Sequence, residues 1–225
     1  MRQIVLDTET TGLEPSQGHR VIEIGAVEVV NRQQTGGVFH VYLNPEREID
    51  AGAQAVHGLS VEFLADKPRF AEVAKEFLDF VRGAELVIHN APFDVGFLNA
   101  ELARLEEGTV ASRCTVLDTL KLAKQMHPGQ KNNLDALCKR YLVDNSGRHY
   151  HGALLDAQLL AEVYLAMTRG QETLGIDLGS PGAAAVKMPV RKGPLSVIRA
   201  DAAEQEAHAA YLAALTRESG GEVSW

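Results

Sequence analysis

The chain opens with a short apolar run, residues 2–6, followed at once by the acidic motif Asp7-Thr-Glu9-Thr-Thr-Gly12. The β-branched run predicts a buried strand. Because side chains alternate along a strand, Asp7 and Glu9 point to the same face, about 7 Å apart. Two carboxylates beside a core repel each other, and hard divalent cations are the usual remedy. Taken alone, the motif also fits a strand that simply runs into a polar turn.

Composition limits the classes of function. The 225 residues are 45% apolar, which is enough for one substantial core and a tail, and the net charge is -8. A free-standing nucleic-acid binder normally has a basic surface, so bound cations or a partner protein must offset this charge. Only Cys114 and Cys138 are present, without CxxC spacing, which indicates a reducing cytoplasm. We find no export signal or long apolar run, and expect no membrane insertion.

Periodicity predicts an α/β fold. Strand-like segments occupy residues 2–6, 21–30, 37–43, 85–89 and 115–120. Helical spacing of apolar residues occupies 70–81, 93–105, 133–141 and 152–168. We expect a turn at Gly36-Gly37 and an irregular stretch over residues 45–68. Three strands that can form a meander, followed by alternating helices and strands, predict a mixed sheet flanked by helices.

The end of the chain differs from the rest in composition. Residues 175–194 are rich in Gly, Ala and Pro, which is typical of a linker. Asp201 and Glu204 have capping-box spacing before an Ala-rich segment, so a helix is expected there. Its apolar face is formed by His208, Tyr211, Leu212 and Leu215. Such a helix is marginal alone, so we expect a flexible tail whose helix needs the domain or another protein.

Two further polar signals follow in the chain. Asn90-Ala-Pro-Phe93-Asp94 comes directly after a predicted strand, where an Asp is often only a helix N-cap. In His151-Gly-Ala-Leu-Leu-Asp156, the acid falls within a helical apolar pattern, although a solvated helix-face Asp is the simpler interpretation. His151 is expected just before that helix, with His149 as a competitor and a surface His as the default.

If these segments converge, Asp7, Glu9, Asp94 and Asp156 form a cage of oxygen ligands suited to two Mg²⁺ or Mn²⁺ ions. Two such ions can clamp a phosphodiester between an attacking water and a leaving oxygen. An imidazole beside that water can accept its proton, which predicts His151 as general base.

The three motifs, in this order and spacing, resemble those of the DEDDh exonuclease family across about residues 2–168. The resemblance implies a ribonuclease-H-like fold and two-metal removal of nucleotides from 3′ ends. Longer runs, such as residues 21–31 and 151–158, resemble the family of epsilon proofreading subunits of bacterial DNA polymerase III. This second resemblance implies that Asp7, Glu9, Asp94 and Asp156 are metal ligands and that His151 is the catalytic base. The substrate contacts that it implies are Asp7, Glu9, His57, Asn90, Phe93 and Asp156.

The same resemblance divides the chain into an exonuclease domain (1–170), a linker (171–200) and a polymerase-docking segment (201–225). The last segment would bind the alpha catalytic subunit of the polymerase. Gln171, Leu174 and Ile176 resemble a sliding-clamp motif in which Ile176 replaces an aromatic residue, so clamp binding is expected to be weak. A second departure is Ala51-Gly-Ala53, where the family often has an acidic residue, and this leaves one substrate contact open.

Two other functions fit the motifs. An RNA exonuclease resembling RNase T or oligoribonuclease would use the same cage, although it has little use for a linker and docking helix. A module that only tethers polymerase to clamp would need the tail and not the acids. We expect a cytoplasmic, metal-dependent 3′–5′ exodeoxyribonuclease that proofreads during DNA replication.

Overall fold

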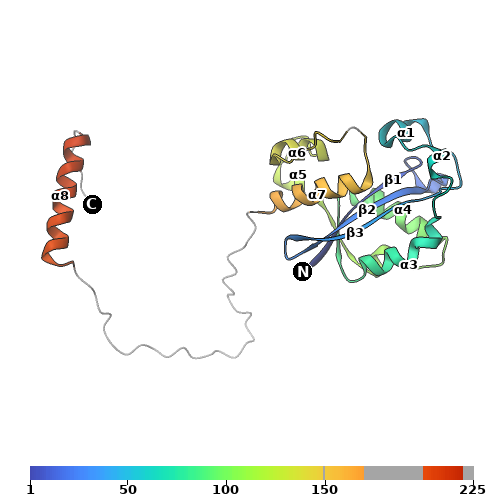
Figure 1. Cartoon of the computed structure of the whole chain (residues 1–225), viewed down its shortest axis with the longest axis horizontal. Coiled ribbons are helices and arrows are strands. Elements are labelled where there is room, and N and C mark those ends of the chain that lie inside the picture. Colours follow the sequence, from blue (N-terminus) through green and yellow to red (C-terminus); the bar gives the residue numbers. More distant parts are fainter. Residues whose placement is uncertain (149, 170–199, 220–225) are drawn as a thin grey trace, which may run out of the picture. The chain divides into compact units, whose positions relative to one another are not determined.

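The computed structural model describes residues 1–148, 150–169 and 200–219, which form two separate units, 1–169 and 200–219 (Figure 1). His149, the expected clamp motif at Gln171, Leu174 and Ile176, and the expected linker up to residue 199 lie outside these residues. Among the described helices, none has the length and apolar character needed to cross a membrane.

A five-stranded mixed sheet lies at the centre of the first unit, in the order β3-β2-β1-β4-β5. The first three strands form an antiparallel meander, and β4 and β5 continue the sheet in parallel with β1. The bounds are β1 (Arg2–Thr10), β2 (Val21–Val30), β3 (Gln33–Tyr42), β4 (Glu85–Ile88) and β5 (Thr115–Asp118). The predicted mixed sheet is therefore confirmed.

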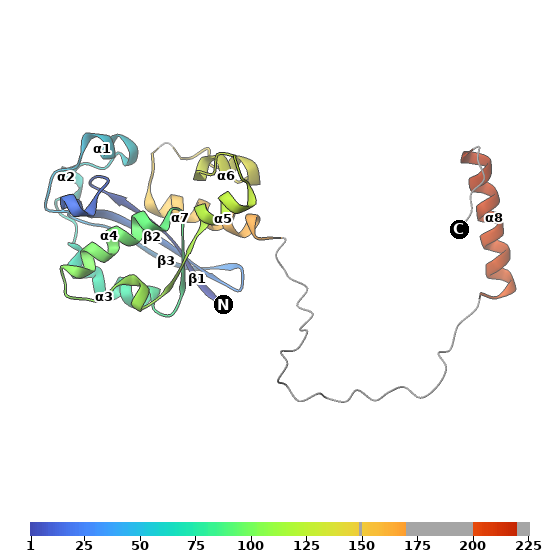
Figure 2. The ribbon, with the colours of Figure 1, turned by 180° about the vertical axis from the view of Figure 1, so that it is seen from behind.

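Helices cover both faces of this sheet, and Figures 1 and 2 show the two layers from opposite sides. One core joins the sheet to α3 and α4, and a second joins it to α5, α6 and α7. The bounds are α3 (Phe70–Val81), α4 (Ala91–Ala103), α5 (Thr119–Met126), α6 (Leu134–Tyr141) and α7 (Ala153–Met167). Two 3₁₀ turns, η1 (Pro15–Gln17) and η2 (Val110–Ser112), lie in loops.

The alternation of β1 decides which layer each side chain faces. Ile4 and Leu6 belong to the α3–α4 core, whereas Val5 belongs to the α7 core. Because the strand period is two, Asp7 and Glu9 continue the Val5 series and point toward the α7 layer. The two acids therefore share a face, as the sequence predicts.

Three local predictions are wrong. The β2–β3 turn lies at Asn31-Arg32, both with positive φ, and not at Gly36-Gly37, so β3 begins earlier than expected. The stretch expected to be irregular contains α1 (Ala51–His57) and α2 (Val61–Leu64). The strand expected to reach residue 120 ends at Asp118, whose side chain accepts the N–H groups of Leu120 and Lys121 and starts α5.

The second unit is one helix, α8 (Ala202–Ser219). It begins with the predicted capping box. Asp201 Oδ1 accepts the Glu204 N–H at 2.9 Å, and Glu204 Oε2 accepts the Asp201 N–H at 3.0 Å. The helix also extends beyond Leu215, where the sequence pattern weakens.

Candidate active site

The two acids of the first motif stand on the part of β1 that outruns its parallel neighbour. On β1, β4 pairs only with Gln3–Leu6, so from Asp7 onward β1 has β2 on one side and none of the described strands on the other. The crevice at the carboxyl ends of parallel strands is the usual ligand site of such sheets. The sheet therefore opens at the residues where the acidic motif begins.

Asp94 reaches this opening from the start of α4. Asn90, in the left-handed region at φ 67°, turns the chain from β4 into the helix and stands at its N-cap position. Asp94 Oδ1 accepts two hydrogen bonds from Thr8, from the backbone N–H at 3.1 Å and from Oγ1 at 2.7 Å. The interpretation of Asp94 as a simple N-cap is wrong, because its carboxylate is bound to the end of β1.

Asp156 is brought to the same place by close packing of α7 on β2. Gly25 pairs with Asp7 across the sheet, and a Cβ on Gly25 would lie 2.1 Å from the Leu154 backbone nitrogen. Only glycine allows this approach, which sets the first turn of α7 beside Asp7. Asp156 is buried at 3% exposure, so the interpretation as a solvated helix-face acid is wrong.

His151 lies on the loop just before α7, as predicted. Its backbone N–H donates to the Val56 carbonyl at 3.1 Å, and its Nδ1 lies 3.5 Å from Asp156 Oδ2. One ligand atom from each of Glu9, His151 and Asp156 lies within 4.8 Å of the other two. The ring is half exposed, so it can meet both the acids and solvent.

These groups line one cavity of about 650 Å³. Every residue predicted for catalysis, metal binding or substrate binding in the first unit lines it: Asp7, Glu9, His57, Asn90, Phe93, Asp94, His151 and Asp156. The set thus converges on one site, although the individual roles remain predictions.

The electrostatics of the cavity disfavour a full set of charges. Burial, followed by repulsion from Asp94, Glu9 and Asp156, holds the pKa of Asp7 well above its usual value. Burial likewise raises the pKa of Glu9 to about 8 and that of Asp94 to about 7. Crowded oxygen donors of this kind match the ligand preference of hard divalent cations. The residues present therefore fit a magnesium or manganese site.

His57 lines the cavity, and the Nε2 atom of its ring is buried. It is buried at the end of α1, and its Nδ1 accepts the Leu59 N–H at 3.0 Å. The ring proton therefore resides on Nε2, which has no hydrogen-bond partner among the described residues. Burial lowers the pKa of His57, so the ring is a neutral donor.

Sequence reasoning missed Arg148 and Asp135, which also line the cavity. The Arg148 side chain is only 7% exposed and pairs with both Asp135 and Asp156. The sequence hardly distinguishes this arginine from an ordinary loop cation, because its burial depends on the packing of α6 and α7. The one available signal is its position, three residues before His151.

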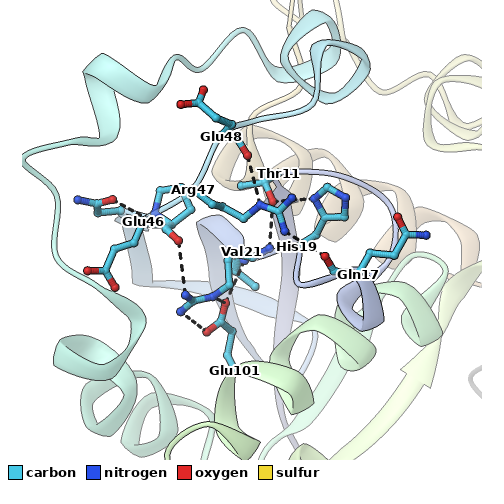
Figure 3. Close-up of polar contacts among 11 residues, drawn as sticks. Thr11, Gln17, His19, Val21, Glu46, Arg47, Glu48 and Glu101 are labelled. Carbon is cyan, nitrogen blue, oxygen red and sulfur yellow. Dashed lines mark hydrogen bonds and ion pairs between the residues drawn. The ribbon is translucent and has the colours of Figure 1, made fainter.

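Polar contacts hold the segment between β1 and β2 (Figure 3). Glu101, buried on α4, accepts the Val21 N–H and two hydrogen bonds from Arg20. Thr11 Oγ1 contacts His19 Nδ1 at 3.0 Å, and the Thr11 carbonyl accepts the Asp50 N–H ahead of α1. This network ties α4 and α1 to β1, the three elements that carry Asp94, His57 and the acidic motif.

Comparison with known proteins adds independent evidence. The family model described as exonuclease matches residues 4–164. DNA polymerase III subunit epsilon of Escherichia coli (strain K12) is 52% identical, over 100% of this chain and 97% of that protein.

Two solved structures show the same fold. Exonuclease X in complex with 5′ overhanging duplex DNA has a TM-score of 0.60 and 26% identity, covering 75% of this chain and 92% of that one. The nuclease domain of 3′hExo, a DEDDh family member bound to rAMP, has a TM-score of 0.65 and 18% identity, covering 76% and 92%. The expected ribonuclease-H-like fold is confirmed.

Proposed function

The chain belongs to the exonuclease family and, within it, to the epsilon subunits of DNA polymerase III, and we propose that it is the 3′–5′ exonuclease that proofreads during DNA replication. It removes mismatched nucleotides from DNA 3′ ends by hydrolysing the terminal phosphodiester. The observation that carries this proposal is the meeting of four carboxyl groups from β1, α4 and α7 with one imidazole in a single cavity.

Exonucleases of this family depend on divalent metal ions. We propose two ions, Mg²⁺ or Mn²⁺, held by Asp7, Glu9, Asp94 and Asp156. Such a pair, when bound, supplies an activated water and neutralises charge on the leaving oxygen. The raised pKa values of Asp7, Glu9 and Asp94 support the assignment, since a cation is what would keep these three carboxyl groups ionised together.

The chain's own side chains accept the proton and orient the DNA end. His151 takes the proton of the attacking water, because burial, and then the nearby Arg148 charge, lower its pKa and keep it neutral. His57, which lines the cavity at the end of α1, approaches the terminal nucleotide. Phe93, partly exposed at the cavity, and Asn90, at its mouth, contact the last nucleotide.

The acidic net charge suits a subunit that receives its substrate from a polymerase. We propose that segment 201–225 docks on the alpha catalytic subunit of DNA polymerase III in the cytoplasm. Gln171, Leu174 and Ile176 within the 171–200 segment would bind the sliding clamp weakly. The exonuclease domain, 1–170, then acts on a frayed 3′ end.

The test compares release of a 3′-terminal nucleotide from mismatched DNA, paired DNA and single-stranded RNA, with Mg²⁺, with Mn²⁺ and with a chelator. We expect metal-dependent cleavage that is faster on the mismatched end than on the paired end. Equal rates on both ends would reject proofreading, and faster cleavage of RNA would favour an RNA exonuclease.

Single substitutions test the acid set itself. Asp7→Asn and Asp156→Asn should each abolish cleavage while the far-ultraviolet circular dichroism spectrum is unchanged. Asp144→Asn is the matched control, because this acid is exposed on the loop before His151 and does not line the cavity. Substantial cleavage by either cavity variant would reject the proposed set of metal ligands.

A further inference from the structure

Arg148 contacts the candidate site through all three nitrogen atoms of its guanidinium group. Its Nε and Nη2 atoms donate to Asp156 Oδ1 at 2.5 Å and to Oδ2 at 2.6 Å. Nη1 donates to Asp135 Oδ1 at 2.8 Å, and Nη2 lies 3.0 Å from His151 Nδ1. One buried guanidinium thus contacts three cavity residues at once.

The bidentate pair with Asp156 occupies the atoms that a metal ion would use. Both carboxylate oxygens of Asp156 accept hydrogen bonds from the planar fork of Arg148. A divalent cation needs lone pairs of the same oxygens. Arg148 and a cation at Asp156 are therefore competitors.

The contact with His151 also sets the state of that ring. Guanidinium groups only donate, so His151 Nδ1 is the acceptor and the proton of the neutral ring resides on Nε2. While Arg148 remains in place, Nδ1 is occupied and Nε2 has no lone pair for a proton. Neither nitrogen is then available to act as a base.

Asp135 offers Arg148 a second place to bind. It lies in the first turn of α6, its side chain is 49% exposed, and its Oδ1 also accepts Asn145 Nδ2 at 3.1 Å. Arg148 can release Asp156 and stay paired with Asp135 without becoming a buried, unpaired charge.

We propose that Arg148 is a positioning residue of the metal site: it holds Asp156 and His151 before a cation binds, and it moves onto Asp135 when one does. Cation binding then releases both the metal ligand Asp156 and the base His151 from Arg148 in one step. This inference rests on the proposed function, since it requires divalent cations to bind at Asp156.

The test measures the affinity of the full-length protein for Mn²⁺ by isothermal titration calorimetry, with no nucleotide present. In Arg148→Gln the competitor is gone, and the affinity should rise on the order of tenfold, the equivalent of one charge-assisted hydrogen bond. Arg148→Lys keeps the charge without the bidentate fork and should fall between Gln and Arg. Unchanged or weaker affinity in both variants would overturn the proposal.

The matched control is Arg140→Gln, which removes one positive charge from α6. Among the described residues, Arg140 bonds to Asn132 and the Lys131 carbonyl and to no cavity acid, so its loss should leave Mn²⁺ affinity unchanged. An increase equal to that of Arg148→Gln would mean that net charge alone is responsible. If Arg148→Gln does not fold, Arg148→Lys decides the question, because long-range charge is constant in that variant.

A second measurement reports on the ring of His151. In the metal-free protein, ¹⁵N resonances should show His151 protonated at Nε2, and Arg148→Gln should introduce the Nδ1-protonated form. An identical tautomer in both proteins would contradict the contact. Absence of any Mn²⁺ binding by the unsubstituted protein would instead reject the proposed function itself.

Discussion

At the scale of single residues, the carboxyl groups of the cavity are held where their charged forms are disfavoured. Asp7 and Glu9 extend the alternation of a buried strand, and Asp94 is buried against Thr8. The same burial that raises their pKa values removes the water that would otherwise screen them. A metal-free form of this protein therefore retains protons that the unfolded chain gives up.

The first prediction concerns the pH dependence of stability without metal. Unfolded Glu9 loses its proton near the ordinary pKa of 4.5, whereas folded Glu9 keeps it up to about 8. The folded state binds more protons over this window, so the free energy of unfolding should fall as pH rises from about 5 to about 8. Urea unfolding with a chelator at several pH values measures this trend.

Two comparisons check its cause. Added Mg²⁺ should flatten the fall, because a cation favours the ionised folded state. Glu9→Gln should remove part of it, because one of the raised carboxyl groups is gone. A metal-free protein that becomes more stable across this pH range would contradict the assignment.

The second prediction is that His151→Gln lowers kcat by about 10²–10⁴-fold, the usual contribution of a general base. Mn²⁺ affinity and thermal stability should remain close to those of the unsubstituted protein. His57→Gln, which removes another imidazole from the same cavity, should raise KM for the DNA end more than it lowers kcat. An unchanged rate in His151→Gln would transfer the role to another group, with His149 the first to examine.

At the scale of elements, the contact between α7 and β2 decides where Asp156 lies. The helix packs on β1 and β2, and its first turn rests on the backbone of Gly25. Gly25 in turn pairs with Asp7. The distance between two of the proposed metal ligands therefore depends on a residue that has no side chain.

The third prediction follows from that contact. In Gly25→Ala the new Cβ would lie 2.1 Å from Leu154 N and 2.2 Å from the Ala153 carbonyl carbon, so α7 must shift. We expect a loss of about 1–3 kcal/mol in stability and a much larger loss of cleavage. Equilibrium unfolding and nuclease assays on the same sample separate the two effects.

Gly96→Ala is the matched control for this substitution. Gly96 lies inside α4, and a Cβ there would meet nothing within 4 Å. Alanine should therefore gain up to about 1 kcal/mol from helix propensity and preserve cleavage. If Gly25→Ala behaved in the same way, close packing of α7 would not position Asp156.

At the scale of the whole molecule, the described residues form two units, the exonuclease unit and the unit that contains α8. All groups that line the cavity belong to the first unit. The catalytic proposal and the docking proposal are therefore independent of each other.

The fourth prediction uses this separation. A chain that ends at residue 169 should cleave single-stranded DNA at about the full-length rate, since both cores of the first unit remain complete. It should no longer co-purify with the alpha subunit of the polymerase. Retained co-purification would locate the docking surface on the first unit, and lost cleavage would show that the tail serves the fold.

Elements with strong periodicity could be predicted from the sequence. The strand at Val21–Val30 and the helix at Phe70–Val81 have the expected bounds, because their apolar residues pack against a core along their full length. The short helix Ala51–His57 could not be predicted, because it buries only His57 and has no apolar period. The hairpin turn was misplaced because glycines are only one way to supply positive φ, and here Asn31 and Arg32 supply it.

The sequence by itself determined the exonuclease family, and it supplied the four acids and one histidine that are proposed to carry the chemistry. Strand alternation is a local property, so it also decided that Asp7 and Glu9 share a face. Only the tertiary structure decided that Gly25 receives α7, and that Arg148 occupies Asp156 and His151. Those contacts depend on how distant helices and strands pack together, and no pattern of neighbouring residues encodes that packing.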